Sequence, residues 1–244
     1  MDAHPIELPE TLSAASLEAL EQALVRAEAD ARARVWLVTG GDGTFCRGMD
    51  LAGYAAGGVS GAALGSLRQF GACIGRLRRA GRPTIALVDG AVQGGGVGLA
   101  AACDIVLCTP RSSFALPEAL FGLLPGIVLP VLLERMTLQQ ARLLTLLGSA
   151  RDAGFAVAHG LADEVVPAGE LRRRAARLGR ELGRVGTPRV RGLRAWLYEA
   201  VTLDPEAALA CGAEVTAELL KDDDVRRGIQ AFLADGTPPW EQEP

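Results

Sequence analysis

The sequence predicts an α/β layer protein in which buried strands alternate with helices. Two observations on the pattern carry this prediction. Short apolar runs of strand length are separated by segments with helical periodicity. Clusters of glycine follow two of these runs, where a strand has to end. The composition agrees, because 49% hydrophobic and 22% charged residues in a chain of 244 are typical of a folded protein with a large core.

The first predicted elements are a helix and a strand. Apolar residues recur at helical spacing over 17–29, which predicts a helix with Ser13 or Ser16 as its N-terminal cap. Residues 35–39 (VWLVT) are apolar and β-branched and predict a buried strand. The glycine-rich segment 40–43 ends that strand.

The rest of the chain continues the alternation. A helix is predicted over 62–80 and buried strands over 84–88 and 105–108. Between these strands, a glycine cluster at 94–98 is followed by a predicted helix of small residues that runs through Cys103. The second half is predicted to be helical over 137–160 and over most of 168–233, with the apolar segment 165–167 between them.

Charge and cysteine content exclude several classes of protein. The net charge of −4 argues against general nucleic-acid binding. The five cysteines are odd in number and form no C-x-x-C pair, so we expect no disulfide framework, no metal site and a reducing cytoplasm. No apolar run has the length of a membrane helix and no basic leader is evident, so we expect no membrane association.

The glycines after the strand at 84–88 mark the first candidate site. Gly94, Gly95 and Gly96 lie between that strand and the next helix, so their amides can face a ligand with no Cβ in the way. Unpaired amides at a helix start favour an oxyanion or a phosphate. Close packing of strand against helix explains the same glycines equally well. A dinucleotide site is disfavoured, because residues 109–112 place no acid where the ribose needs one.

Two segments around these glycines resemble a known family. Residues 44–51 (TFCRGMDL) resemble the FCAGADL loop of the crotonase (enoyl-CoA hydratase/isomerase) superfamily. The three glycines, followed by residues 103–105 (CDI), resemble its GGG…CDI segment.

Two later segments extend the resemblance. Residues 114–126 resemble the family's F-x-x-P-E…G-x-x-P-G segment, and residues 158–167 resemble its A-x-x-G-L-V-D-E-V-V segment. The resemblance implies a crotonase-like ββα spiral core over residues 1–167, which holds the active site. It also implies a C-terminal helical trimerisation region over residues 168–244, with homotrimers or dimers of trimers.

Within the superfamily, residues 113–125, 128–130 and 236–241 are most similar to the dehydratases of polyketide β-branching cassettes. Those lyases remove water from 3-hydroxy-3-methylglutaryl carried on an acyl carrier protein and give the 3-methylglutaconyl thioester. The resemblance implies the same reaction here and an acyl carrier protein as partner. It implies no cofactor, because the substrate is carried on the phosphopantetheine of the carrier, or on CoA.

The family pattern assigns the catalytic groups. It places two oxyanion-hole amides at Met49 and Gly95 and the second of two catalytic glutamates at Glu118. The first glutamate falls on Gly98, a glycine that the β-branching dehydratases share. The two amides are expected to hold a thioester enolate while Glu118 removes the α-proton. With no acid at position 98, Glu118 is expected to serve both proton transfers, which fits syn elimination.

Further residues are weaker candidates. Substrate contacts are expected from Arg47, Tyr54, Gln93, Gly94, Phe121 and Leu124. The substrate's distal carboxylate needs a partner, and the candidates for it are Arg47, Arg76, Arg78 and Arg82. Apolar neighbours are expected to desolvate Glu118 and raise its pKa, namely Leu116, Leu120 and Phe121. Structural roles are expected for His159, Asp50, Asp89 and Asp104.

A basic stretch follows the core. Residues 171–194 contain nine arginines and one acid, Glu181. A solvated helix face explains them, and so does a dock for an acidic carrier protein or for CoA phosphates. Three other functions remain open: a double-bond isomerase, a decarboxylase of the glutaconyl product, and a non-catalytic partner protein with the crotonase fold.

Overall fold

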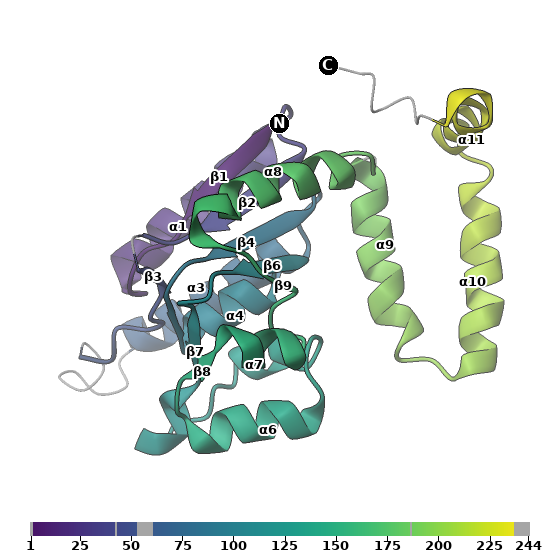
Figure 1. Ribbon diagram of the computed structural model, residues 1–244. Helices are drawn as coiled ribbons and strands as arrows, with labels where there is room; N and C mark the ends of the chain where they lie inside the picture. Colours follow the sequence, from purple (N-terminus) through teal and green to yellow (C-terminus); the bar gives the residue numbers. More distant parts are fainter. Residues whose placement is uncertain (1, 42, 53–60, 186, 237–244) are drawn as a thin grey trace. The chain divides into compact units, whose positions relative to one another are not determined.

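Two β-sheets organise the chain, of which the computed structural model describes residues 2–41, 43–52, 61–185 and 187–236. The larger sheet has the order β1-β2-β4-β6-β9, and all its neighbouring strands are parallel (Figure 1). Its strands are β1 (Ala3–Glu7), β2 (Val35–Thr39), β4 (Thr84–Val88), β6 (Ile105–Cys108) and β9 (Glu164–Val165).

The smaller sheet has the order β3-β5-β7-β8 and is parallel except for the pair β7–β8. Its strands are β3 (Thr44–Cys46), β5 (Ala91–Gln93), β7 (Ser113–Ala115) and β8 (Arg151–Asp152). The chain repeatedly enters the larger sheet, crosses to the smaller one and returns through a helix. Helices α3 (Gly61–Arg78) and α4 (Gly95–Ala101) make the first two returns. This repetition confirms the expected α/β fold with a ββα spiral core.

The three strands predicted at 35–39, 84–88 and 105–108 have the observed bounds of β2, β4 and β6. All five residues of β4 are buried, and β2 and β6 are mostly buried. A parallel strand covered on both faces needs a nearly continuous apolar run, which is the pattern the sequence shows.

Helix α1 (Ala14–Ala29) begins at a capping box, which decides between the two predicted caps. The Ser16 amide donates to Ser13 Oγ at 3.2 Å, and the Ser13 amide donates to Ser16 Oγ at 2.8 Å. Ser13 is therefore the N-cap, a role worth about 1 kcal/mol in helices of proteins. The predicted stripe Leu17, Leu20, Leu24 and Ala27 is buried, and α1 packs against α3.

The continuous helical segment predicted over 137–160 is wrong in detail. The structure has α6 (Leu138–Leu147), then β8, then α7 (Ala153–Ala158). Helix α6 ends at Gly148, whose φ of 59° is left-handed and favours glycine. Asp152 then accepts a hydrogen bond from the Phe155 amide at 2.7 Å and starts α7.

The remaining helices complete the described chain. They are η1 (Pro117–Phe121), α5 (Val128–Leu132), η2 (Ala168–Glu170), α8 (Leu171–Leu182), α9 (Thr187–Ala200), α10 (Pro205–Leu219) and α11 (Asp223–Asp235). The chain divides into two compact units, Met1–Gly179 and Arg180–Pro244. The division at residue 167 and the oligomerising role of residues 168–244 stay predictions.

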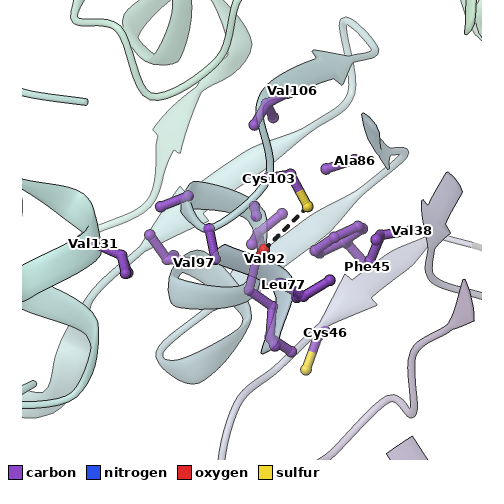
Figure 2. Packing of buried hydrophobic residues seen from close by; sticks show 14 of the residues in the cluster. Val38, Phe45, Cys46, Leu77, Ala86, Val92, Val97, Cys103, Val106 and Val131 are labelled. Carbon is purple, nitrogen blue, oxygen red and sulfur yellow. Dashed lines mark hydrogen bonds between the residues drawn. The ribbon is translucent and has the colours of Figure 1, made fainter. Parts of the chain in front are cut away.

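A close-packed core anchors the strands and the helix that carry the glycine-rich segments. Phe45 and Cys46 of β3, Val92 of β5 and Val97 of α4 are at most 1% exposed (Figure 2). Burial raises the pKa of the Cys46 thiol to about 11, so this thiol stays protonated at neutral pH. Each fully buried side chain of this kind contributes about 1.5–3 kcal/mol, which holds the adjoining loops in place.

Candidate active site

Glu118 lies in the short helix η1, which directly follows β7. Leu116 is fully buried and Pro117 starts η1, so the chain places the carboxyl of the next residue against the start of α4. A Cβ added to Gly94 would stand 3.1 Å from Glu118 Oε1. Glu118 Oε2 is buried and has no hydrogen-bond partner in the described part of the chain. Burial raises the pKa of Glu118 above the ordinary glutamate value.

The loop after β3 pairs with Leu12 in a way that directs the Met49 amide away from Leu12. Leu12 N donates to Gly48 O at 2.8 Å, and Asp50 N donates to Leu12 O at 3.1 Å. These two bonds form a parallel bridge between Leu12 and Met49. In such a bridge the N–H of the central residue points to the opposite side, so the Met49 amide does not face Leu12.

The start of α4 lies against this loop. A Cβ added to Gly48, which has a φ of 81°, would stand 2.7 Å from Gly95 N. Only glycine allows this approach, because the conformation is left-handed and the space is occupied. Gly95 is the first residue of α4, and first-turn amides have no acceptor within their helix.

A third contact ties these segments to the strand that leads into Glu118. Gly94 N donates to Ala115 O at 3.0 Å, and Ala115 is the last residue of β7. The structure thus brings together the carboxylate of Glu118, the α-carbon of Gly94, the Gly95 amide and the Gly48–Met49 loop. Two amides and one carboxylate in this arrangement can hold a carbonyl oxygen and move a proton at the neighbouring carbon.

Position 98 carries no acid and lies in tight, apolar surroundings. A Cβ on Gly98 would stand 3.0 Å from Ile74 Cδ1 and 3.1 Å from Val128 Cγ2. Both neighbours are buried apolar side chains. A carboxylate placed there would lose its hydration against hydrocarbon, so Glu118 is the only acid of the two family positions in this chain.

The weaker sequence candidates lie in different surroundings. The Arg47 carbonyl oxygen lies 3.9 Å from the place of a Cβ on Gly94, and the Gln93 carbonyl lies 2.9 Å from that of Gly48, so both backbones border the site. Phe121 is 48% exposed and Leu124 is 85% exposed. Tyr54 lies outside the described residues.

The expected apolar surroundings of Glu118 are only partly present. Leu116 is fully buried. Leu120 is 65% exposed, and its side chain lies on Gly148, where an added Cβ would approach Leu120 Cγ to 2.7 Å. Of the three expected apolar neighbours, Leu116 is therefore the one that is buried, while Leu120 and Phe121 are exposed.

All four arginine candidates have a partner elsewhere in the chain, and that of Arg47 is Glu10. Arg76 Nη1 donates to Glu28 Oε2 at 2.9 Å, and Arg78 Nε donates to Glu134 Oε2 at 2.9 Å. Arg82 donates to the carbonyl oxygen of Ala33. Among the four, Arg47 is the one whose backbone borders the Glu118 site.

The residues expected to be structural hold backbone or side chains in place. Asp104 Oδ2 accepts from the Thr84 amide at 2.6 Å, and Asp89 Oδ1 accepts from Thr109 Oγ1 at 2.8 Å. His159 Nδ1 lies 2.8 Å from Gln140 Nε2. His159 follows the last residue of α7 and Gln140 belongs to α6, whereas Glu118 belongs to η1.

The described residues contain no group of three or more His, Cys, Asp or Glu side chains that can hold a metal ion. None of the helices described is both long and apolar enough to cross a bilayer.

Sequence reasoning missed two supports of the site. Leu12 forms the bridge that orients Met49. Glu10 accepts two hydrogen bonds from Arg47, one from the amide to its carbonyl oxygen and one from Nε to its carboxylate. Neither residue belongs to a motif, because the contacts are made across the fold. The glycine at position 48 was a usable signal, since glycine is the residue that allows a left-handed conformation and a close backbone approach.

Comparison with known proteins places the chain in a family. The family model for enoyl-CoA hydratase/isomerase matches residues 6–243. Human enoyl-CoA hydratase domain-containing protein 3 is 32% identical over 165 residues, which is 66% of this chain and 54% of the human protein. Its crystal structure superposes with a TM-score of 0.89 and 25% identity, and covers 98% of this chain and 96% of that chain.

Two bacterial relatives are named as dehydratases. Carnitinyl-CoA dehydratase of Proteus mirabilis is 30% identical over 90% of this chain and 85% of its own length. Bacillaene synthase dehydratase PksH of Bacillus subtilis is 32% identical over 66% of this chain and 61% of its own length. The chain thus spans about half to five sixths of these curated relatives. It belongs to the enoyl-CoA hydratase/isomerase family, the crotonase superfamily.

Proposed function

We propose that this chain is a hydro-lyase that dehydrates 3-hydroxy-3-methylglutaryl on an acyl carrier protein to the 3-methylglutaconyl thioester. Hydratases and dehydratases are the named activities among its relatives, which supports a hydro-lyase. The single observation that carries the mechanism is the position of the Glu118 carboxylate against Gly94, next to the Gly95 amide.

The reaction begins at the α-carbon of the thioester. Glu118 takes the α-proton, and the negative charge moves to the thioester oxygen. The amides of Met49 and Gly95 donate to that oxygen, and the loss of one such donor costs about 3–4 kcal/mol of barrier in comparable enzymes. The raised pKa of Glu118 makes it a stronger base than an exposed carboxylate.

The second half of the reaction releases water. The bond from the β-carbon to the hydroxyl breaks, the α,β double bond forms, and the proton held by Glu118 leaves with the hydroxyl as water. A single acid serves both transfers because position 98 carries no carboxylate and is bordered by the apolar side chains of Ile74 and Val128. One carboxylate acting on both carbons requires that the proton and the hydroxyl leave from the same face.

The carrier-bound substrate rests on two supports. PksH, named as a dehydratase of bacillaene synthase, is similar to this chain over 66% of its length. Helix α8 also presents Arg172 and Arg177 as exposed cations, while its buried face is Leu171, Ala175 and Gly179. An acidic carrier protein matches such a surface. A homotrimer or dimer of trimers in a reducing cytoplasm is part of the same proposal.

A double-bond isomerase is the second candidate. One carboxylate beside two amides also moves a proton between the α- and γ-carbons of an unsaturated thioester, and Gly98 favours this reaction as much as a one-acid dehydration. The two reactions differ in mass balance, because isomerisation releases nothing.

Mass spectrometry of the carrier-bound thioester tests the proposal. Incubation of 3-hydroxy-3-methylglutaryl on an acyl carrier protein with the enzyme is expected to give the loss of one water. A further loss of carbon dioxide identifies a decarboxylase. An unchanged mass contradicts the dehydration and favours the isomerase or a non-catalytic role. Incubation with 3-methylglutaconyl thioester in deuterated water then separates an isomerase from a non-catalytic protein. Only an isomerase introduces deuterium at the γ-carbon, and it does so with no loss of water or carbon dioxide.

A further inference from the structure

The geometry points to Arg47 as the residue that binds an anionic group of the substrate, either the distal carboxylate of the acyl chain or the phosphate of the pantetheine arm. This inference deepens the proposed function and rests on it for the identity of the substrate. The sequence leaves four arginines open for such a role, and the structure separates them by position, because the backbone of Arg47 borders Gly94.

Arg47 is fixed at the site through its backbone. Its amide donates to Glu10 O at 2.7 Å, and its carbonyl oxygen lies 3.9 Å from the place of a Cβ on Gly94. The same place is 3.1 Å from Glu118 Oε1. Arg47 is also two residues before Met49, whose amide is one of the two proposed donors. The side chain therefore starts from the backbone that borders the reacting atoms.

The guanidinium of Arg47 has free capacity. Its Nε donates to Glu10 Oε1 at 3.0 Å, and this is its one ion pair within the described ranges. An arginine has five N–H donors in a planar fork, which suits a carboxylate or a phosphate with two oxygens. The side chain is 45% exposed and that of Glu10 is 66% exposed, so a ligand can reach the fork and the pair is weak.

The pairing with Glu10 suggests an exchange of partners. In the free protein, the Glu10 carboxylate holds the guanidinium of Arg47 without burying it. A bound substrate brings a second anion. The guanidinium of Arg47 then either keeps its hydrogen bond to Glu10 or exchanges it for one to the substrate, according to where the substrate anion lies. In either case Glu10 competes with the ligand for the same cation, so its removal favours the ligand.

This competition distinguishes a binding role from a structural one. If the Arg47–Glu10 pair only holds the loop, Arg47→Gln and Glu10→Gln break the same contact and have the same effect. If Arg47 binds substrate, the two substitutions act in opposite directions. The backbone bond between Arg47 N and Glu10 O remains in both variants, so the loop keeps its main attachment.

Isothermal titration calorimetry with thioesters that lack a β-hydroxyl measures binding with no turnover. Glutaryl-N-acetylcysteamine carries the distal carboxylate, pentanoyl-N-acetylcysteamine carries no charge, and pentanoyl-phosphopantetheine carries only the phosphate. We expect Arg47→Gln to raise the Kd of the ligand whose anion it binds by about two- to fivefold, in the range of a partly exposed ion pair. Glu10→Gln is expected to lower that Kd, and the uncharged ligand is expected to respond to neither.

Arg76→Gln is the matched control. It removes the same charge and breaks a similar pair, that between Arg76 and Glu28 on α3 and α1. No change in Kd is expected. An effect confined to glutaryl identifies the carboxylate as the anion, and an effect confined to phosphopantetheine identifies the phosphate.

Two results overturn the inference: equal weakening of all ligands by Arg47→Gln and Glu10→Gln, or wild-type protein that binds neither charged ligand more tightly than the uncharged one. The proposed function fails separately. A carrier-bound hydroxyacyl chain that keeps its water, together with Arg47-dependent glutaryl binding, rejects the dehydration and retains the anion site.

Discussion

The carboxylate of Glu118 faces the bare α-carbon of Gly94, and a side chain there would meet Oε1 at 3.1 Å. This relationship joins a short helix after β7 to the start of α4, two segments held together by the bond from Gly94 N to Ala115 O. The absence of a Cβ at position 94 leaves the space beside the carboxylate for a substrate atom. The predictions below test the parts of this arrangement one at a time.

The first prediction concerns pH. Burial raises the pKa of Glu118, so kcat/KM for dehydration is expected to fall as the pH drops through a value above that of an ordinary glutamate. The stability effect has the opposite sign. A group whose folded-state pKa is raised binds more protons in the folded state, so its contribution to stability is lost as the pH rises through that pKa.

Glu118→Gln is therefore expected to remove this loss of stability, so that the variant unfolds at a higher denaturant midpoint than the wild type at neutral pH but not at low pH. Paired urea titrations at the two pH values measure it. A variant less stable than the wild type at neutral pH contradicts the burial argument.

The second prediction concerns the close approach of two backbone segments. In Gly48→Ala, the new Cβ would meet Gly95 N at 2.7 Å and push the two proposed donors apart. The expected loss in kcat is about 10²- to 10³-fold, as for the removal of an oxyanion donor. Gly43→Ala is the matched control, because Gly43 also has a positive φ, of 72°, but no atom within 4 Å of the added Cβ. Equal losses in both variants would mean that backbone strain, not donor geometry, is responsible.

The third prediction concerns position 98. Gly98→Ala is expected to change the free energy of unfolding by less than about 1 kcal/mol, because the gain of Ala over Gly within α4 offsets the small shift that the methyl group forces on Ile74 Cδ1 and Val128 Cγ2. Gly98→Glu is expected to cost more and to add no hydration activity towards an enoyl thioester. Thermal unfolding and an absorbance assay of hydration measure the two effects. A stable Gly98→Glu protein with increased hydration would refute the one-acid account.

The fourth prediction concerns helix α8. Charge reversal at Arg173 and Arg177 is expected to raise KM for the carrier-bound substrate and to spare a pantetheine-bound one, since a docking surface is used only by the carrier protein. Arg173 also pairs with Glu170 at 2.7 Å, so Glu170→Gln is the control for loss of that pair. Steady-state kinetics on both substrates measure the difference. Equal loss on both substrates would exclude carrier docking at this helix.

The three central strands of the larger sheet were predictable from sequence, whereas its edge strands β1 and β9 and the smaller sheet were not. Strands β2, β4 and β6 have four or five residues and are almost wholly apolar, which makes a strong signal. Strands β3, β5 and β7 have three residues each, too few to show a period. The break between α6 and α7 depends on the left-handed Gly148 and on pairing of β8 with β7, and the second of these is a tertiary contact.

The candidate site was predictable in its residues but not in its contacts. Family motifs point to Met49, Gly95 and Glu118, because motif positions are visible in one chain. The Leu12 bridge that turns the Met49 amide, and the partners that engage Arg76 and Arg78 elsewhere, arise from segments distant in sequence. Sequence reasoning overestimated the apolar cover of Glu118, since Leu120 lies on Gly148 instead.

The rate at which Glu118→Gln removes water from 3-hydroxy-3-methylglutaryl on its carrier protein tests the central claim most directly. The amide keeps the size of the side chain but takes no proton, so the rate is expected to fall by about 10²- to 10⁴-fold from the wild-type value, with unchanged binding of the glutaryl thioester. A variant that dehydrates the substrate as fast as the wild type would show that this carboxylate takes no part in the reaction.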